Sequence, residues 1–394
     1  MKALPTGWTA NDLGNIVDFK TGKLNSNVAV ANGAYPFFTC SQETFRTNTF
    51  AFDTECVLLA GNNANGIYPL KYFHGRFDAY QRTYVITPKN SEHLNTRFLY
   101  YALRPLLEHL KSISTGAATK FLTLTILNGL RLRFPPEPTQ RKIAGILSAY
   151  DDLIENNTRR IAILEEMAQA IYREWFVHFR FPGHEKVKLV DSALGKIPVG
   201  WKVMSLFDVC EVAYGFPYKS KQFTVEPIGK PIIRIRDIIG HKSDTYTEED
   251  AGPKYIVKNG DILIGMDGDF HMCRWAGGEA VLNQRVARLR TTGQLPQYVL
   301  FHVVKGPVEH FNATIVGTTV AHLGDKHLRE INVVLPSLEI LEEARLQFEP
   351  LHLEEINLRK RNELLRKTRD LLLPKLISGQ VDVEGLEIEV PKSD

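Results

Sequence analysis

The sequence predicts an α+β protein with two similar globular modules, each followed by one long α-helix, the two helices packing as an antiparallel coiled coil. Three observations support this prediction. Short motifs recur in the same order in both halves of the chain, short apolar runs fill each half, and a seven-residue apolar repeat closes each half. The 394 residues, 44% hydrophobic and 24% charged, are typical of a globular protein with two or three domains.

The repeated motifs indicate an internal duplication. The tetrapeptide Pro-Thr-Gly-Trp at residues 5–8 returns as Pro-Val-Gly-Trp at residues 198–201. Further pairs follow in the same order: Gly22-Lys23 with Gly215-Phe216, Val57-Leu58-Leu59 with Ile262-Leu263-Ile264, Gly75 with Gly278, Gln81-Arg82 with Gln284-Arg285, Gly116-Ala117-Ala118-Thr119 with Gly317-Thr318-Thr319, Leu122 with Leu323, and Pro135 with Pro336. Because the order is kept and the offset drifts only slightly, duplication explains these pairs better than chance.

Each module has a mixed content of strands and helices. Apolar runs bounded by Gly, Asn and Pro predict strands at residues 56–59, 84–86, 261–264 and 331–335, and helices are expected at 96–113 and 296–310. The expected boundaries are a first module at 1–135, its helix at 136–180, a linker at 181–197, a second module at 198–335, its helix at 336–379 and a C-terminal tail at 380–394.

A heptad pattern marks the first long helix. Its inward positions, called seam 1, are Ile143, Leu147, Tyr150, Ile154, Asn157, Ile161, Leu164, Ala168, Ile171 and Trp175. The pattern lies between a proline cluster that ends at Pro138 and the pair Pro182-Gly183. Only Asn157 is polar, and a single Asn in such a seam sets the register of pairing at some cost in stability.

The second long helix has a less regular pattern. Leucine recurs at every seventh position, at Leu351, Leu358, Leu365 and Leu372. The residues expected to broaden this apolar face are Phe348, Leu353, Ile356, Leu364 and Leu371. Pro374 is expected to kink or end the helix, and Gly379 follows it.

The two helices need partners for their apolar faces. A helix of about 40 residues is roughly 60 Å long, and it is not stable alone when one face is apolar. The simplest partner is the other helix, and a pseudo-two-fold relation between the modules makes the pair antiparallel, with one module at each end. The alternative is that each helix packs only on its own module.

Composition and motifs argue against several functional classes. The net charge of +3 does not by itself indicate nucleic-acid binding, no run of apolar residues suits a signal peptide or a membrane span, and the four cysteines form no CxxC pair. We therefore expect a cytoplasmic protein with reduced cysteines and no metal site. The sequence also lacks a GxxxxGK[ST] loop, an HExxH motif and the motif of amino-methyltransferases, since Pro135-Pro136 is flanked by Phe134 and Glu137. We expect no catalysis and no cofactor bound by this chain.

Several of these motifs together resemble one known family. The run Gly260-Asp261-Ile262-Leu263-Ile264-Gly265-Met266-Asp267-Gly268-Asp269-Phe270, followed by Arg274-Trp275 and Asn283-Gln284-Arg285-Val286, is similar to a run in the specificity subunits of type I restriction-modification systems. The order of module, long helix, module, long helix is also similar. The first module carries a weaker form of the run, with Cys56 where the second has Asp261.

The resemblance implies a specific role. Each module would be a target recognition domain that reads half of an asymmetric, bipartite site in double-stranded DNA. The helices would set the spacing of the half-sites and dock two modification (methyltransferase) subunits, and restriction (endonuclease and translocase) subunits would join the complex. S-adenosylmethionine, and ATP with Mg²⁺, would be bound by those partner subunits.

Candidate DNA-binding residues form three loop clusters in each module. Arg and Lys suit guanine, Asn and Gln suit adenine, and Asp suits the cytosine amino group. The first cluster contains Lys20, Lys23 and Asn25, paired with Tyr218, Lys219, Ser220 and Lys221. The second contains Asn62, Asn63 and Asn65, paired with Asp267, Asp269 and His271. The third contains Arg76, Gln81 and Arg82, paired with Arg274, Asn283, Gln284 and Arg285.

Other interpretations stay open at this point. Asp267 and Asp269 could instead shape a turn, and Gln284-Arg285 could be a structural pair. A basic run on the last helix, from Arg359 to Arg369, suits DNA phosphates, a partner subunit or a solvated face. A stand-alone methyltransferase or nuclease predicts product from the purified chain alone. A coiled-coil scaffold predicts no sequence-selective DNA binding even with partners present.

Overall fold

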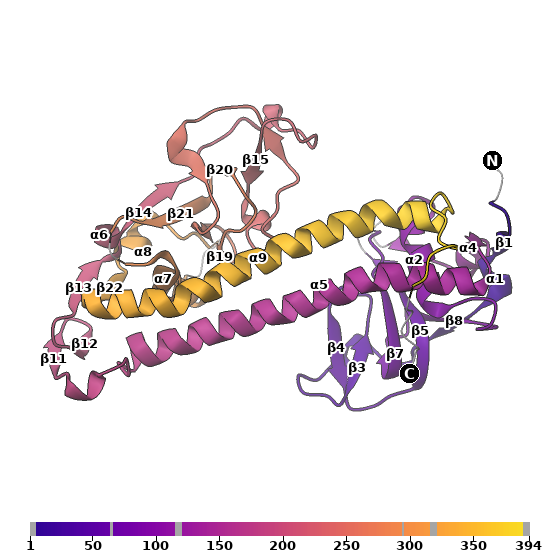
Figure 1. The fold of residues 1–394 in the computed structure, drawn as a ribbon, viewed down its shortest axis with the longest axis horizontal. Helices are drawn as coiled ribbons and strands as arrows, with labels where there is room; N and C mark the ends of the chain where they lie inside the picture. The colour runs from indigo at the N-terminus through magenta and orange to yellow at the C-terminus, as the bar shows by residue number, and fades with distance from the viewer. Residues whose placement is uncertain (1–4, 64–65, 115–119, 294, 316–320, 389–394) are drawn as a thin grey trace. The chain divides into compact units, whose positions relative to one another are not determined.

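The computed structural model describes residues 5–63, 66–114, 120–293, 295–315 and 321–388. The chain divides into two compact units, one of Met1–Glu155 with Glu363–Asp394 and one of Asn156–Asn362. Each unit therefore contains one module and a part of both long helices, which are the two long coiled ribbons in Figure 1. In the described part of the chain, no helix combines the length and the apolar character needed to cross a membrane.

The first unit has a six-stranded sheet in the order β2-β8-β5-β7-β3-β4, and strand pairs β1-β10 and β6-β9. Its strands are β1 (Thr9–Asp12), β2 (Val17–Thr21), β3 (Tyr35–Phe38), β4 (Thr44–Thr47), β5 (Phe52–Ala60), β6 (Asn62–Asn63), β7 (Leu70–Ala79), β8 (Thr83–Pro88), β9 (Lys120–Phe121) and β10 (Arg131–Phe134). Its short helices are α1 (Leu13–Ile16), α2 (Thr96–Leu103), α3 (Leu107–Ile113) and α4 (Leu124–Asn128).

Local sequence explains the main elements of this unit. The run from Cys56 to Ala60 is wholly buried, as expected for a central strand that is covered on both faces. The Asn95 side chain caps α2 by accepting the Phe98 backbone N–H at 2.9 Å. The helix predicted at residues 96–113 is interrupted by a 3₁₀ turn that contains Pro105, which has no N–H to continue the hydrogen-bond ladder.

The second unit contains two four-stranded sheets, β14-β21-β18-β19 and β16-β15-β20-β17, and strand pairs β13-β22 and β11-β12. Its strands are β11 (Leu189–Ser192), β12 (Gly195–Pro198), β13 (Lys202–Ser205), β14 (Cys210–Tyr214), β15 (Lys230–Ile233), β16 (Tyr246–Thr247), β17 (Ile256–Val257), β18 (Ile262–Gly265), β19 (Met272–Arg274), β20 (Ala280–Leu282), β21 (Val286–Thr291) and β22 (Asn332–Leu335). Its short helices are α6 (Leu206–Val209), α7 (Gln297–Thr314) and α8 (Asp325–Arg329).

The two modules share one topology, which confirms the predicted duplication. The strand order β2-β8-β5-β7 in the first module matches β14-β21-β18-β19 in the second. Each module also pairs its first strand with its last, and each has one parallel strand pair, β3 with β7 and β15 with β20. The long strand β7 corresponds to the two short strands β19 and β20, which are separated by Gly277-Gly278.

The long helices are α5 (Glu137–Tyr172), which continues into a π-helical turn (Arg173–Val177), and α9 (Leu338–Ile377). Every residue of seam 1 is buried or half-buried, as predicted. In the second unit, buried Asn157 donates a hydrogen bond from Nδ2 to Asn362 Oδ1 at 2.9 Å. The pair Arg160–Glu354 has an N–O distance of 2.7 Å, so the helices run antiparallel in this unit.

The two helices also meet in the first unit, where Asp151 of α5 forms an ion pair with Arg369 of α9. Both helices also contribute side chains to the core of the first module, including Ile143, Leu147 and Leu376. The helices therefore pack both on each other and on a module. The sequence had offered these two arrangements as alternatives, and the structure combines them. Coiled-coil packing along the full helices stays a prediction.

Several expectations about the long helices and their flanks need correction. Pro374 does not end α9, which continues to Ile377. Leu353, Leu364 and Leu371 do not broaden the packed face, because they are 54%, 63% and 67% exposed. The expected linker contains the hairpin of β11 and β12, and the start of the expected tail packs in the core of the first unit through buried Val383.

The end of α9 supplies a stability test. Gly379 has φ +70°, and a Cβ there would lie 2.7 Å from Pro5 Cγ and 2.9 Å from Trp8 Cζ2. We expect Gly379→Ala to lower the free energy of unfolding by ~1–3 kcal/mol, because it combines left-handed backbone strain with overpacking. Urea denaturation measures this loss. Gly385→Ala is the control, since no atom lies within 4 Å of its Cβ; an equal loss in both variants would contradict the explanation.

Candidate nucleic-acid interface

Backbone hydrogen bonds bring the three loop clusters of the first module together. The Gln81 N–H donates to the Leu24 carbonyl at 3.0 Å, and the Gly61 N–H donates to the Arg82 carbonyl at 2.7 Å. The Leu122 N–H donates to the Gly61 carbonyl at 2.9 Å. These three backbone hydrogen bonds are called the frame of the module. Loops that are distant in sequence therefore meet at one edge of the module.

The second module has the same frame of hydrogen bonds. The Gln284 N–H donates to the Phe216 carbonyl at 2.9 Å, and the Met266 N–H donates to the Arg285 carbonyl at 2.9 Å. The Leu323 N–H donates to the Met266 carbonyl at 2.8 Å. The repeated bonds show that the paired motifs occupy equivalent places in the two folds.

The repeated glycines make this close approach possible. A Cβ on Gly22 would lie 1.7 Å from the Ala79 carbonyl oxygen, and a Cβ on Gly215 would lie 1.8 Å from the Asn283 carbonyl oxygen. No side chain fits at either position, so the first loop cluster can lie against the third only if glycine is present.

Polar side chains on this frame of the first module are mostly exposed. Lys20, Lys23 and Asn25 are exposed, and Gln81 donates to the Asn25 side chain at 3.0 Å. The Arg82 guanidinium lies over the Phe121 ring at 5.5 Å from its centroid. The predicted residues Asn62 and Asn63 form β6 beside it, whereas Asn65 lies outside the described residues.

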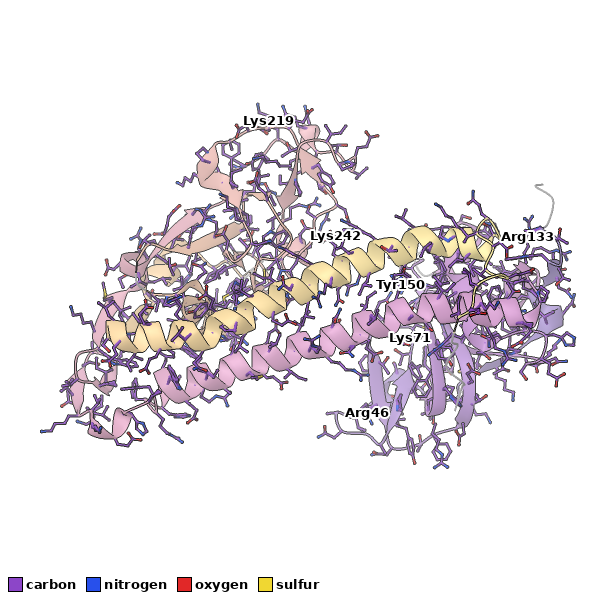
Figure 2. All side chains as sticks on the ribbon, in the orientation of Figure 1. Arg46, Lys71, Arg133, Tyr150, Lys219 and Lys242 are labelled. Carbon is purple, nitrogen blue, oxygen red and sulfur yellow. The ribbon has the colours of Figure 1, made fainter. Side chains whose placement is uncertain are left out.

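The frame of the second module presents a different set of groups. Arg285 has φ +69°, and its Nε lies 3.4 Å from Asp267 Oδ2. The other carboxylate oxygen, Asp267 Oδ1, lies 2.6 Å from His322 Nδ1. The remaining predicted residues with exposed or half-buried side chains are Lys219, Ser220, Lys221, Asp269, His271 and Gln284. Figure 2 labels Lys219 at the outer surface of this module.

Four predicted residues are poorly placed to bind DNA. One lies away from the frame, and three have little exposed surface. Arg76 is paired with Asp53 near the start of β5, whereas Arg82 meets the chain just beyond the end of that strand. Tyr218, Asn283 and Arg274 are buried, with exposed fractions of 5%, 8% and 8%. Their burial favours structural roles, and DNA binding by each predicted residue stays a prediction.

Arg274 belongs to a buried ionic network within the second unit. Its guanidinium forms an ion pair with Glu355, which in turn accepts from Arg359 Nε at 3.0 Å. Arg359 also reaches Glu165 with an N–O distance of 2.6 Å. Burial lowers the pKa of Arg274 and raises the pKa of Glu165, because both lose hydration.

Three histidines around this network should make the protein sensitive to acid. Burial, with a smaller contribution from the positive charge of Arg274, lowers the pKa of His241 and His352 to about 4 and that of His302 to about 3. Below the ordinary pKa of about 6.5, the unfolded chain binds protons that the folded chain excludes. The free energy of unfolding should therefore fall as the pH drops from 6.5 toward 4.5.

The expected loss is on the order of 2–4 kcal/mol, since each group contributes at most ~1.4 kcal/mol per pH unit and two of them are partly exposed. Urea denaturation at several pH values measures it. His302→Phe preserves an aromatic ring beside Tyr172, on which His302 stacks, and should reduce the slope. An unchanged slope in that variant would show that His302 does not contribute.

Two residues at the frame were missed by sequence reasoning. Phe121 and His322 lie directly before Leu122 and Leu323, which the duplication had already paired. An aromatic residue and a histidine are both common next to ligands, so their positions beside a matched motif were an available signal. The surrounding residues at 115–119 and 316–320 lie outside the described part of the chain.

Half of the basic residues in the run on α9 form ion pairs within the protein. Arg359 and Arg369 form ion pairs with carboxylates of α5, and Lys367 pairs with Glu363. Lys360, Arg361 and Arg366 are exposed. No group of three or more potential metal ligands is present among the described residues.

Both modules have the same hydrogen-bond frame, and each frame presents guanidinium, amide and ammonium groups. This arrangement defines a tandem recognition protein. Such groups donate to base edges and to phosphates, and the loops that carry them are supported by sheets of equal topology.

Comparison with known proteins identifies the family. The model of the type I restriction modification DNA specificity domain matches residues 5–166 and 198–353, so this chain belongs to that family. The MjaIX specificity subunit of Methanocaldococcus jannaschii is 27% identical over 76% of this chain and 72% of that protein. The EcoDI specificity subunit of Escherichia coli is 32% identical over 53% of this chain and 50% of that protein.

A solved structure shows the same fold. The type I restriction-modification system S subunit from M. genitalium matches with a TM-score of 0.61 and 18% identity, over 94% of this chain and 96% of that one. The two family matches lie on the two modules, which agrees with the duplication. Family membership makes this chain a DNA-recognition component and not a catalytic one, as expected from the sequence.

Proposed function

We propose that this chain is the specificity subunit of a type I restriction-modification complex and reads an asymmetric, bipartite DNA target, one half-site per module. The observation that supports this most directly is the repeated hydrogen-bond frame with unlike side chains. Arg82 lies over Phe121 in one module, whereas Arg285 pairs with Asp267 in the other. Two modules with the same backbone frame but different side chains on it suit two half-sites of different sequence.

The proposal extends to the partners of the chain. Two modification subunits would dock on the paired helices, and restriction subunits would join them, in the cytoplasm. S-adenosylmethionine, and ATP with Mg²⁺, would bind to those subunits. Exposed leucines on α9, among them Leu364 and Leu371, provide apolar surface for such contacts.

A module exchange tests the proposal. Residues 1–135 would be replaced by the corresponding module of another specificity subunit, and the chain would be co-expressed with its modification subunits. Genome-wide methylation mapping should show that one half of the target changes while the other half and the spacer stay the same. Exchange of residues 198–335 is the reciprocal control. Unchanged methylation sites in both chimeras would refute modular reading.

A further inference from the structure

The frame allows residues of the two modules to be matched one by one. Gly61 and Met266 are equivalent, because each donates its N–H to the arginine carbonyl and accepts from the leucine N–H. The next residues, Asn62 and Asp267, are therefore equivalent. Asn62 pairs with Phe121 as antiparallel strand partners, and Asp267 pairs with His322 in the same way.

These equivalent positions differ in chemistry. In the first module, the aromatic face of Phe121 lies under the Arg82 guanidinium, and Asn62 Oδ1 accepts from Cys40 Sγ at 3.0 Å. A ring contact of this kind holds the cation without occupying the N–H donors that lie in the plane of the guanidinium. Arg82 can therefore offer its donors to a ligand.

In the second module, a carboxylate holds the arginine instead. Asp267 Oδ2 lies 3.4 Å from Arg285 Nε, and the side chains are 29% and 57% exposed. His322 Nδ1 lies against the other carboxylate oxygen at 2.6 Å and restricts the rotation of the Asp267 side chain. Arg285 is thus held by its side chain, and its own backbone has φ +69°, a conformation that is rare for residues other than glycine.

We propose that these matched pairs, Asn62 with Phe121 and Asp267 with His322, determine which base each module selects through its arginine. They act as positioning residues: they set the direction of the guanidinium and the number of donors it has free. This inference rests on the proposed function, because it assumes that Arg82 and Arg285 face base edges. It adds the residues that make the two half-sites different.

The test is a reciprocal exchange of the matched pairs. N62D/F121H gives the first module the residues of the second, and D267N/H322F does the reverse. Each full-length variant is co-expressed with its modification subunits, and methylation is mapped on a library of randomised target sites. We expect N62D/F121H to change or relax one position of the first half-site by about 10- to 100-fold, with the second half-site unchanged. D267N/H322F should affect only the second half-site.

Three controls separate positioning from folding. The unchanged half-site shows that each variant is folded and assembled. Arg131→Ala removes an exposed arginine of the first module that pairs with Asp12, and it should leave both half-sites intact. His322→Asn retains a side-chain donor for Asp267 and should preserve more discrimination than His322→Phe.

The outcomes distinguish this inference from the proposed function. If the unaltered complex methylates DNA without sequence preference, the proposed function fails. If that complex is selective but both exchanges leave the two half-sites unchanged, the matched pairs do not select bases and this inference is wrong. If an exchange alters both half-sites equally, the pairs support folding and not selection, which also overturns it.

Discussion

Glu355→Ala is expected to lower the free energy of unfolding by ~3–5 kcal/mol, because it leaves the Arg274 guanidinium buried without its counter-ion. The side chains of Arg274 and Glu355 are only 7% and 6% exposed. Desolvation of the arginine already lowers its pKa, which shows that the network holds an unfavourable buried charge. Arg359 would lose the same carboxylate, so the guanidinium groups of Arg274 and Arg359 would repel each other.

The neighbouring residue supplies the matched control. Glu354 of α9 pairs with Arg160 of α5, but these side chains are 36% and 50% exposed. Glu354→Ala should therefore change the free energy of unfolding by no more than ~1 kcal/mol. Both variants would be compared by chemical denaturation at pH 7. Equal losses in the two variants would mean that burial does not govern the strength of these pairs.

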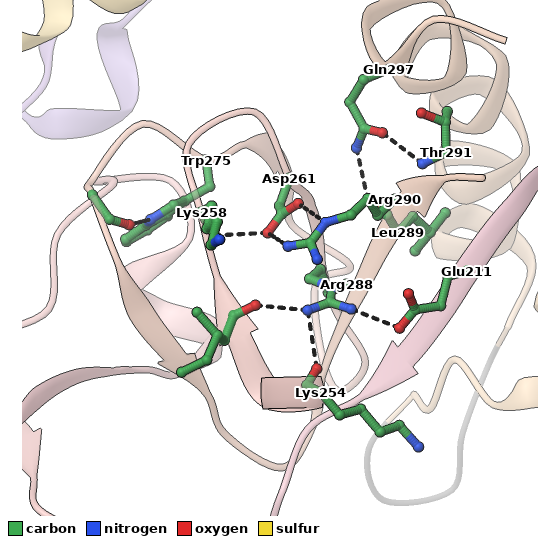
Figure 3. Close-up of polar contacts among 12 residues, drawn as sticks. Glu211, Lys254, Lys258, Asp261, Trp275, Arg288, Leu289, Arg290, Thr291 and Gln297 are labelled. Atoms are coloured by element: carbon green, nitrogen blue, oxygen red, sulfur yellow. Dashed lines mark hydrogen bonds and ion pairs between the residues drawn. The ribbon is translucent and has the colours of Figure 1, made fainter. Parts of the chain in front are cut away.

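Arg288→Ala is the second large effect, also expected at ~3–5 kcal/mol, because it orphans buried hydrogen-bond acceptors. The Arg288 side chain is 1% exposed. Its Nη1 donates to the carbonyls of Lys254 at 3.0 Å and Ile256 at 2.7 Å, and its Nη2 reaches Glu211 at 2.8 Å (Figure 3). One side chain thus joins β14, β17 and β21 of the second module.

A volume-matched variant separates the lost donors from the lost packing. Arg288→Met retains much of the side-chain volume, so it should fill the space but leave both carbonyls without a donor. We expect the free energy of unfolding of Arg288→Met to be lower than that of the unaltered protein by ~2 kcal/mol or more. Stability close to that of the unaltered protein in Arg288→Met would show that packing, and not hydrogen bonding, explains the effect.

Fold prediction from the sequence succeeded where the signal was periodic or repeated. Seam 1 was placed correctly along α5, including buried Asn157, because an apolar residue every three or four positions lies on one side of a helix. It failed on α9 at Leu353, Leu364 and Leu371, since the pattern there is less regular. Of the two outcomes expected at Pro374, a kink or an end of the helix, the end does not occur, because tertiary contacts hold the last turn.

Site prediction succeeded in part for a related reason. Motif pairs placed Gln81-Arg82 and Gln284-Arg285 on the same structural frame, because duplicated segments fold alike. Arg274 was grouped with them, although it is committed to Glu355. Arg274 and Arg285 look equally available in the sequence, and nothing near them along the chain distinguishes the two.

The sequence by itself determined the duplication, the α+β class, the two long helices and the family resemblance, since motif order and heptad spacing are properties of neighbouring residues. Only the tertiary structure decided which polar side chains are free, because their partners are remote in sequence. Arg274 finds Glu355, and Asp267 finds His322, at separations of 81 and 55 residues. Burial and pairing at that range depend on packing, which no local pattern encodes.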